Sequence, residues 1–209
     1  MAGRSDTKVL IMDIAEKAVL EKGFEATSIE EIVAGAEISR SGFFYHFNDK
    51  NALARALIER YIAAEDALFD EIFGRARDLN DDPLHAMLIG LKLLAERLDD
   101  LPAGHPGCVV AAAAYQDRLF DRGVRELNRQ AILGWRARFR AMFEEIAAVY
   151  EPRAPIDLDA LGDMVSGVVE GALVLQRVLG ERQTVSQQIL QFRTYVRLLF
   201  SAETAPRAA

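Results

Sequence analysis

The chain has 209 residues, 51% of them hydrophobic, and a formal net charge of −7 at pH 7. This length and apolar content suffice for one or two compact domains and exclude a wholly disordered protein, and the lack of a run of 18 apolar residues argues against a membrane span. The acidic balance excludes a protein that coats nucleic acid with its whole surface, so any such contact must be local. An N-terminus without a signal-peptide core and a single cysteine lead us to expect a cytoplasmic protein.

Alanine, leucine, glutamate and arginine dominate the chain, and no run of alternating β-branched residues appears. The sequence therefore predicts an all-α fold of about nine helices. The first helix is expected from about Asp6 to Lys22, with Gly23 at its C-terminus. Its apolar face repeats at helical spacing through Ile11, Ile14, Ala15, Ala18 and Val19.

Two short helices are predicted next. Thr27 or Ser28 caps the first of them, which ends near Ala36, and Ser39 caps the second. Asn48 or Asp49 then caps a long helix that runs to about Arg77 and holds Lys50 in its first turn. Two short helices joined by a turn of three to four residues have the spacing of a helix-turn-helix, whose second helix enters the major groove of DNA.

The stretch "SRSGFFYHFNDK", residues 39–50, is the predicted second short helix and the turn after it. Small and polar residues open it, and we expect Phe43 and Phe47 to pack inward. Its polar side is expected to face DNA. The candidate DNA-binding residues are Thr27, Ser28, Ser39, Arg40, Ser41, Gly42, Tyr45, His46 and Lys50.

Each of these residues also has a plainer interpretation. The Thr27 hydroxyl is expected at a phosphate, although an ordinary helix cap is compatible with that role. Arg40 is the candidate for reading a guanine edge, and a phosphate contact alone is its alternative. Tyr45 and His46 are expected to position the helix on phosphates, with a packing role as the alternative for His46. Lys50 is expected to meet a phosphate.

Residues 9–60 resemble the N-terminal domain of the tetracycline-repressor (TetR) family of bacterial transcriptional regulators. The match lies in "AEKAVLEKGFEATSIEEIVAGAEISRSGFFYHFNDKNAL", which has the Gly-Phe after the first helix, the Thr-Ser, and the final aromatic element with Lys50. Two residues depart from the family pattern. Glu37 stands where a turn glycine is usual, at a cost on the order of 1 kcal/mol if its φ is positive, and Phe44 stands where many members have tyrosine.

The resemblance implies a DNA-binding domain over residues 1–55 and a helical bundle for effector binding and dimerisation over residues 56–209. Residues 1–60 carry 8 basic and 10 acidic side chains, so one copy would bind DNA weakly and a homodimer is expected. The last two helices are the predicted dimer interface, and an internal core pair is the alternative. The interface residues are expected to be Gly167, Gly171, Leu175, Ile189, Phe192, Val196 and Leu199.

An effector pocket is expected between the central helices. Its candidate lining residues are Met87, Leu91, Cys108, Tyr115, Trp135, Phe139, Met142 and Gln176, although most such apolar stripes are simply core. Glu170 and Gln176 are polar residues on an apolar helix, and a cross-dimer bond or a surface position is their alternative. The leading hypothesis is a repressor that a small, mostly apolar effector releases from a palindromic operator, with no cofactor and no metal.

Two other classes of function remain open at this point. The first is an all-helical enzyme that uses a Cys108/His105 pair, although nothing in the sequence supplies an orienting third group or an oxyanion site. The second is a DNA-binding protein that has no effector.

Overall fold

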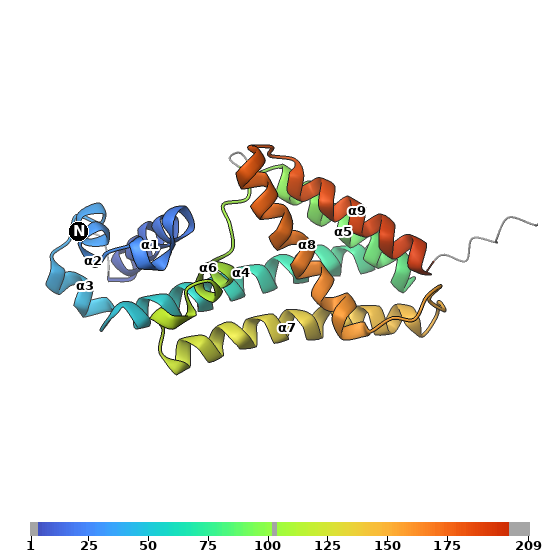
Figure 1. The fold of residues 1–209 in the computed structure, drawn as a ribbon, viewed down its shortest axis with the longest axis horizontal. Coiled ribbons are helices and arrows are strands. Elements are labelled where there is room, and N and C mark those ends of the chain that lie inside the picture. The colour runs from blue at the N-terminus through green and yellow to red at the C-terminus, as the bar shows by residue number, and fades with distance from the viewer. Residues whose placement is uncertain (1–3, 102–103, 201–209) are drawn as a thin grey trace, which may run out of the picture. The chain divides into compact units, whose positions relative to one another are not determined.

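The computed structural model describes residues 4–101 and 104–200 (Figure 1). These residues form nine α-helices and one short 3-10 helix, which confirms the predicted all-α fold. The elements in chain order are α1 (Arg4–Ala26), α2 (Ile29–Gly35), α3 (Arg40–His46), α4 (Lys50–Leu79), α5 (Pro83–Asp99), α6 (Val109–Ala114), η1 (Asp117–Leu119), α7 (Arg122–Ala147), α8 (Leu158–Leu179) and α9 (Thr184–Phe200).

Local chemistry explains where the helices begin and end. Gly23 has φ 86° and ψ 166° and kinks α1 one residue beyond its predicted end, a conformation that costs glycine little because it has no Cβ. Ser28 caps α2 by accepting a hydrogen bond from Glu31 N, and Ser39 caps α3 by accepting one from Gly42 N. Asp82 caps α5 in the same way. Such caps satisfy backbone donors that a helix leaves open at its N-terminus.

The chain divides into two compact units. The first takes in the residues up to Asp66 together with Pro106–Ile132, and the second takes in Ala67–His105 and the residues from Leu133 on. The compact units therefore do not follow the predicted boundary after residue 55, because a segment from the middle of the chain joins the N-terminal helices. The functional division at residue 55 stays a prediction.

In the first unit, α1 packs against both α2 and α6, and α2 packs against α3. The segment around η1 lies on the kinked end of α1, where Phe120 and Phe24 make an edge-to-face pair with centroids 4.9 Å apart. Gln116 Oε1 accepts a hydrogen bond from Glu25 N at 3.1 Å, and Asn51 Oδ1 accepts one from Asp121 N at 3.0 Å. The middle of the chain is thus bonded directly to the helices that precede and follow α2 and α3.

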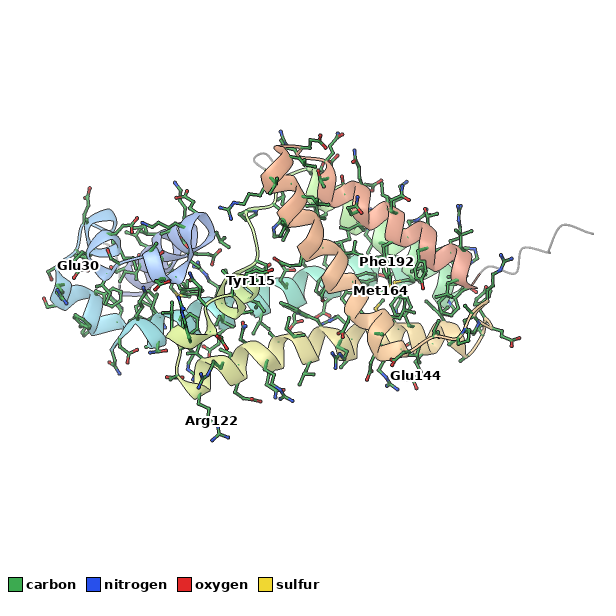
Figure 2. The ribbon with its side chains drawn as sticks, viewed as in Figure 1. Glu30, Tyr115, Arg122, Glu144, Met164 and Phe192 are labelled. Atoms are coloured by element: carbon green, nitrogen blue, oxygen red, sulfur yellow. The ribbon has the colours of Figure 1, made fainter. Side chains whose placement is uncertain are left out.

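In the second unit, α9 packs against α5 and α8. Buried aromatic side chains fill this unit, among them Phe139 and Phe143. Phe192, which Figure 2 labels, is a third. Helices α7 and α8 approach closely at Gly162, where a Cβ atom would lie 3.0 Å from the Arg136 carbonyl oxygen. Arg136 also donates two hydrogen bonds to Asp163, of 2.8 and 2.6 Å. Gly162 is therefore a packing residue between helices of one chain.

Candidate nucleic-acid interface

The turn between α2 and α3 is tight. Ile38 N donates to Val33 O at 3.2 Å, and Glu37 N donates to Ala34 O at the same distance. Glu37 has φ 53°, the left-handed region in which a side chain is disfavoured. The residue that replaces the usual turn glycine therefore does carry the expected strain, on the order of 1 kcal/mol.

Helix α3 has the two different faces that its sequence predicted. Phe43 and Phe47 are 0% and 3% exposed, and they anchor the helix in the first unit. Ser39 and Ser41 are exposed at the N-terminal end of the helix, with their hydroxyl oxygens 2.9 Å apart. Gly42 lies directly beside them and adds no bulk. The start of α3 therefore presents a small polar surface on a rigidly anchored helix.

The later part of α3 carries larger exposed groups. Tyr45 is 62% exposed, and its ring contacts that of His46, with the centroids 5.2 Å apart. His46 is half-buried, in a position between the two roles considered for it. Phe44 is exposed, and its ring lies edge-on against Phe43. Arg40 is exposed as well, and its Nη1 lies 2.9 Å from Glu30 Oε1.

The side chain of Thr27 lies elsewhere than predicted. It is buried, and its hydroxyl donates a hydrogen bond of 2.8 Å to the Gly23 carbonyl. The kink at Gly23 interrupts the helical hydrogen bonds and leaves this carbonyl to be satisfied by a side chain. Ser28 is exposed at the start of α2, where its hydroxyl oxygen accepts a hydrogen bond from Glu31 N.

Lys50 also serves the fold in this structure. Its ammonium group donates to the Phe24 carbonyl, and burial lowers the pKa of Lys50, while the charge of Glu25 acts in the opposite direction. This bond joins the first turn of α4 to the end of α1. No sequence pattern indicates this bond, because the acceptor is a backbone atom that only the kink exposes.

A capped and anchored second helix, joined to α2 by a tight turn and flanked by two longer helices, defines a DNA-binding protein of the helix-turn-helix class. The family model described as "Bacterial regulatory proteins, tetR family" matches residues 11–57 of the chain. That match covers most of α1, all of α2 and α3, and the start of α4.

Curated relatives agree with this match. The chain is 27% identical over 157 residues to the transcriptional regulator AcuR of Cereibacter sphaeroides. The matched segment makes up 74% of this chain and 68% of that protein. It is 24% identical over 118 residues to the transcriptional repressor KstR2 of Rhodococcus jostii, 56% of this chain and about half (52%) of the relative. It is 31% identical over 98 residues to the transcriptional regulator TtgR of Pseudomonas putida, 46% of this chain and 43% of that protein.

Solved structures share the whole fold. The regulatory protein TetR from Rhodobacter sphaeroides has a TM-score of 0.70 and 23% identity, over 91% of this chain and 97% of its own. A TetR-family regulator from Agrobacterium tumefaciens has a TM-score of 0.77 and 19% identity, over 95% and 100% of the two chains. Residues 11–57 thus match the TetR family of bacterial regulatory proteins, and the chain as a whole shares the fold of solved TetR-family structures.

The predicted effector-binding residues fall in both compact units. Met87, Leu91, Trp135 and Phe139 are buried in the second unit, where Met142 and Gln176 are half-buried. Cys108 and Tyr115 belong to the first unit, and Tyr115 is 79% exposed. Tyr115 lies at the surface, at the C-terminal cap of α6.

Gln176 has the feature that singled it out in the sequence. Its Nε2 donates to the His105 carbonyl at 3.2 Å, and its Oε1 is buried without a hydrogen-bond partner among the described residues. A buried acceptor of this kind is unfavourable unless something donates to it. The second unit thus holds an open acceptor where the sequence predicted a polar contact to an effector.

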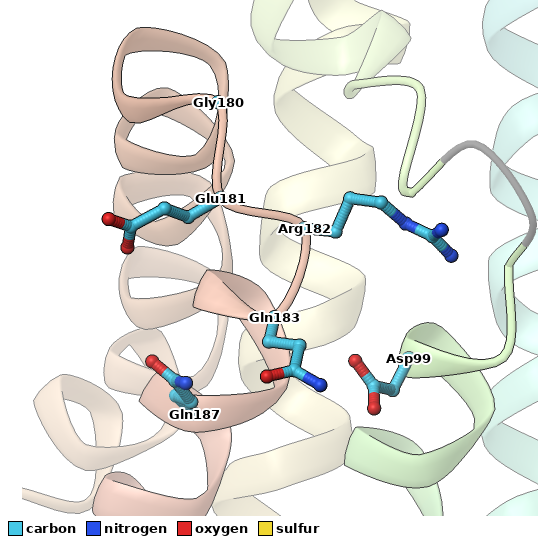
Figure 3. Close-up of a pocket in the computed structure, with 6 residues that line it drawn as sticks. All are labelled: Asp99, Gly180, Glu181, Arg182, Gln183 and Gln187. Atoms are coloured by element: carbon cyan, nitrogen blue, oxygen red, sulfur yellow. The ribbon is translucent and has the colours of Figure 1, made fainter.

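The second unit also has a polar pocket of about 640 Å³, which contains none of the predicted effector-binding residues (Figure 3). It lies where α8 gives way to α9, beside the end of α5. Its lining residues are Asp99, Gly180, Glu181, Arg182, Gln183 and Gln187. A pocket lined in this way does not suit the mostly apolar effector that the sequence suggested.

The seven residues predicted for the dimer interface divide into a buried group of four and an exposed group of three. Ile189, Phe192, Val196 and Leu199 are buried within the chain itself, on the face of α9 that packs against its own unit. Gly167, Gly171 and Leu175 of α8 are exposed, as the prediction requires. The exposed apolar residues of the two helices are Met164, Val174, Leu175, Val178 and Leu179 on α8 and Leu190, Tyr195 and Leu198 on α9.

The residues of the alternative enzyme hypothesis have structural contacts. Cys108 Sγ accepts a hydrogen bond from Ala111 N at 3.4 Å and so caps α6, while burial lowers the pKa of His105.

In the described part of the chain, no helix is both long and apolar enough to cross a membrane.

Proposed function

We propose that the protein is a homodimeric repressor that binds a palindromic operator through α3 and that a small, mostly apolar effector releases it from DNA. The observation that carries the DNA-binding role is the anchoring of α3 by Phe43 and Phe47, which leaves Ser39, Arg40 and Ser41 exposed at its start. Such a surface admits close approach to base edges. The protein acts in the cytoplasm, where bacterial DNA lies, and it is not an enzyme.

The DNA contacts divide into two groups. Ser28, Ser39, Tyr45 and His46 position the protein on phosphates, whereas Arg40 reads a guanine edge with Ser41 and Gly42 beside it. Thr27 is left out of this set because its hydroxyl is buried, and Lys50 is left out because its partly buried ammonium group is held by the Phe24 carbonyl. Residues 38–50 have a net charge of +1, from Arg40 and Lys50 against Asp49. So small a charge supports the view that one copy binds weakly and that two copies act together.

A stripe on α8 supports dimerisation. Met164, Gly167, Gly171, Val174, Leu175 and Val178 are exposed and follow one another at steps of three and four residues, apart from the adjacent Val174 and Leu175. This spacing places them on one side of the helix, and no charged residue lies among them. Exposed apolar stripes of this kind mark protein–protein contacts. Two copies of α8 with two copies of α9 would form a four-helix interface.

Release by an effector requires a connection to the DNA-binding helices. Helix α4 is continuous from Lys50 to Leu79, and the η1 segment is bonded to Glu25 and Asn51 on either side of α2 and α3. An effector that moves either element changes the spacing of the two α3 helices in a dimer. Linkage requires that DNA then lower effector affinity by the same factor.

Selection of DNA by the purified full-length chain tests the proposal. Binding sites enriched from a randomised duplex pool should be inverted repeats whose half-sites lie about one helical turn apart. Arg40→Ala should bind the enriched duplex more weakly and lose preference at one position of each half-site, at a cost of ~1–3 kcal/mol per lost base contact. Enrichment of no sequence by the wild type would contradict the proposed function.

A further inference from the structure

The arginine at the start of α3 is already paired within the protein. Arg40 Nη1 lies 2.9 Å from Oε1 of Glu30, and the two side chains are 67% and 66% exposed. Glu30 lies in the first turn of α2, where Figure 2 labels it. On another side, the guanidinium carbon lies 5.8 Å from the centroid of the Phe44 ring. The side chain proposed to read a base is thus held by two neighbours before DNA arrives.

The positions of both charges favour this pair. A cation at the N-terminal end of a helix is disfavoured by the helix dipole, and Arg40 is the first residue of α3. Glu30 is favoured by the dipole of α2, and its carboxylate neutralises Arg40. The same carboxylate occupies a donor that a guanine edge or a phosphate oxygen would otherwise use. Operator DNA and Glu30 therefore compete for one guanidinium group.

We propose that Glu30 sets the affinity of the protein for its operator by holding Arg40 in the free protein. The proposal rests on the proposed DNA-binding function, and it identifies a residue that weakens DNA binding. An exposed carboxylate–guanidinium pair shifts an equilibrium by up to roughly fivefold. In a dimer the pair must open at both α3 helices, so the two factors multiply. Removing Glu30 should therefore tighten operator binding.

The experiment compares four proteins: the wild type, Glu30→Gln, Arg40→Ala and the double variant. The probe is a duplex of about 30 base pairs that the wild type has enriched from a randomised pool, long enough for two half-sites one helical turn apart. Dissociation constants are measured by fluorescence anisotropy at about 50 and 200 mM salt. Glu30→Gln should bind roughly two- to fivefold more tightly per α3 helix, with the larger gain at low salt.

The Arg40→Ala background separates competition from simple charge repulsion. If Glu30 acts by holding Arg40, Glu30→Gln should give no gain once Arg40 is absent. An equal gain in both backgrounds would mean that Glu30 only repels phosphates, and the proposal would be wrong. Weaker binding by Glu30→Gln alone would also overturn it, because Glu30 would then orient Arg40 for the base or contact DNA itself.

Glu37→Gln is the matched control. Glu37 is exposed in the turn between the same two helices, so this variant removes the same charge and leaves the Arg40–Glu30 pair in place. It should change affinity clearly less than Glu30→Gln, and an equal gain from the two variants would refute the proposal. Circular dichroism should report the same helix content in all five proteins. If the wild type enriches no DNA, the proposed function fails; if it does and Glu30→Gln leaves affinity unchanged, only the Glu30 proposal fails.

Discussion

A leucine in place of Gly167 or Gly171 tests the proposed dimer interface on α8. Among the described residues outside the helix's own backbone, no atom lies within 4 Å of a Cβ atom built on either glycine, so a side chain can extend there from the isolated protomer. Replacing glycine inside a helix also raises helix stability, by roughly 0.5–1 kcal/mol. Circular dichroism should therefore show unchanged helix content, and a loss of dimer at unchanged helix content would be assigned to the interface.

The size of the effect follows from the exposed stripe. Met164, Val174, Leu175 and Val178 are 37%, 49%, 45% and 76% exposed, which together amounts to about two whole side chains. Complete burial of an apolar side chain contributes about 1.5–3 kcal/mol, so the stripe offers roughly 3–6 kcal/mol per protomer and twice that in a symmetric dimer. Association itself costs roughly 4–15 kcal/mol. The interface therefore has little surplus, and the face of α9 with Leu190 and Leu198 must also contribute.

In the proposed dimer, one leucine on each copy of α8 should hold the two helices apart. The dimer would then lose about half of the buried apolar surface described above. A loss of about 3 kcal/mol raises the dimer dissociation constant by roughly 100-fold or more. Sedimentation equilibrium over a range of protein concentrations measures it. Gly134→Leu is the control, since Gly134 of α7 is exposed and likewise has no atom within 4 Å of a built Cβ. Wild-type dimer affinity in both α8 variants would refute the interface.

Three further predictions concern the first unit and the effector. Burial, with the charge of Asp66 beside it, raises the pKa of Glu65 from 4.5 to about 7. Between these two pH values the folded state binds more protons than the unfolded state, so the stability of the fold falls as the pH rises. Glu65→Gln should therefore gain roughly 2–4 kcal/mol in urea unfolding at pH 8 and almost nothing at pH 4, and an equal gain at both would contradict the assignment. Lys50→Met should lose roughly 1–3 kcal/mol of stability, because the Phe24 carbonyl loses its charged donor, while the salt dependence of DNA binding stays unchanged; a salt slope lowered by about one would instead restore Lys50 as a phosphate contact. A compound found by thermal-shift screening that binds the second unit should release the enriched duplex in a titration, and DNA should lower its affinity by the same factor; unchanged operator affinity would exclude it as an inducer.

Patterns within a few residues of one another determined the helix-turn-helix. Caps such as Ser39 act on backbone groups three residues away, and the step of four residues from Phe43 to Phe47 places both rings on one side of a helix. Glycine at position 23 ends a helix because of its own backbone freedom. Both partners of such a short-range interaction lie within a few residues of each other, so the helices, the turn and the buried side of α3 could be predicted from the sequence.

Only the tertiary structure decided which apolar face of α9 meets its own chain. Phe192 and Val196 lie on one side, and Leu190 and Leu198 lie on the other. Periodicity shows that both faces are apolar, but the choice between them depends on what α5 and α8 present. The contacts of Lys50 and Arg40 were likewise hidden, because their partners, Phe24 O and Glu30, lie 26 and 10 residues away along the chain. Folding alone brings such groups together, since neither a charge nor a backbone carbonyl marks its distant partner in the sequence.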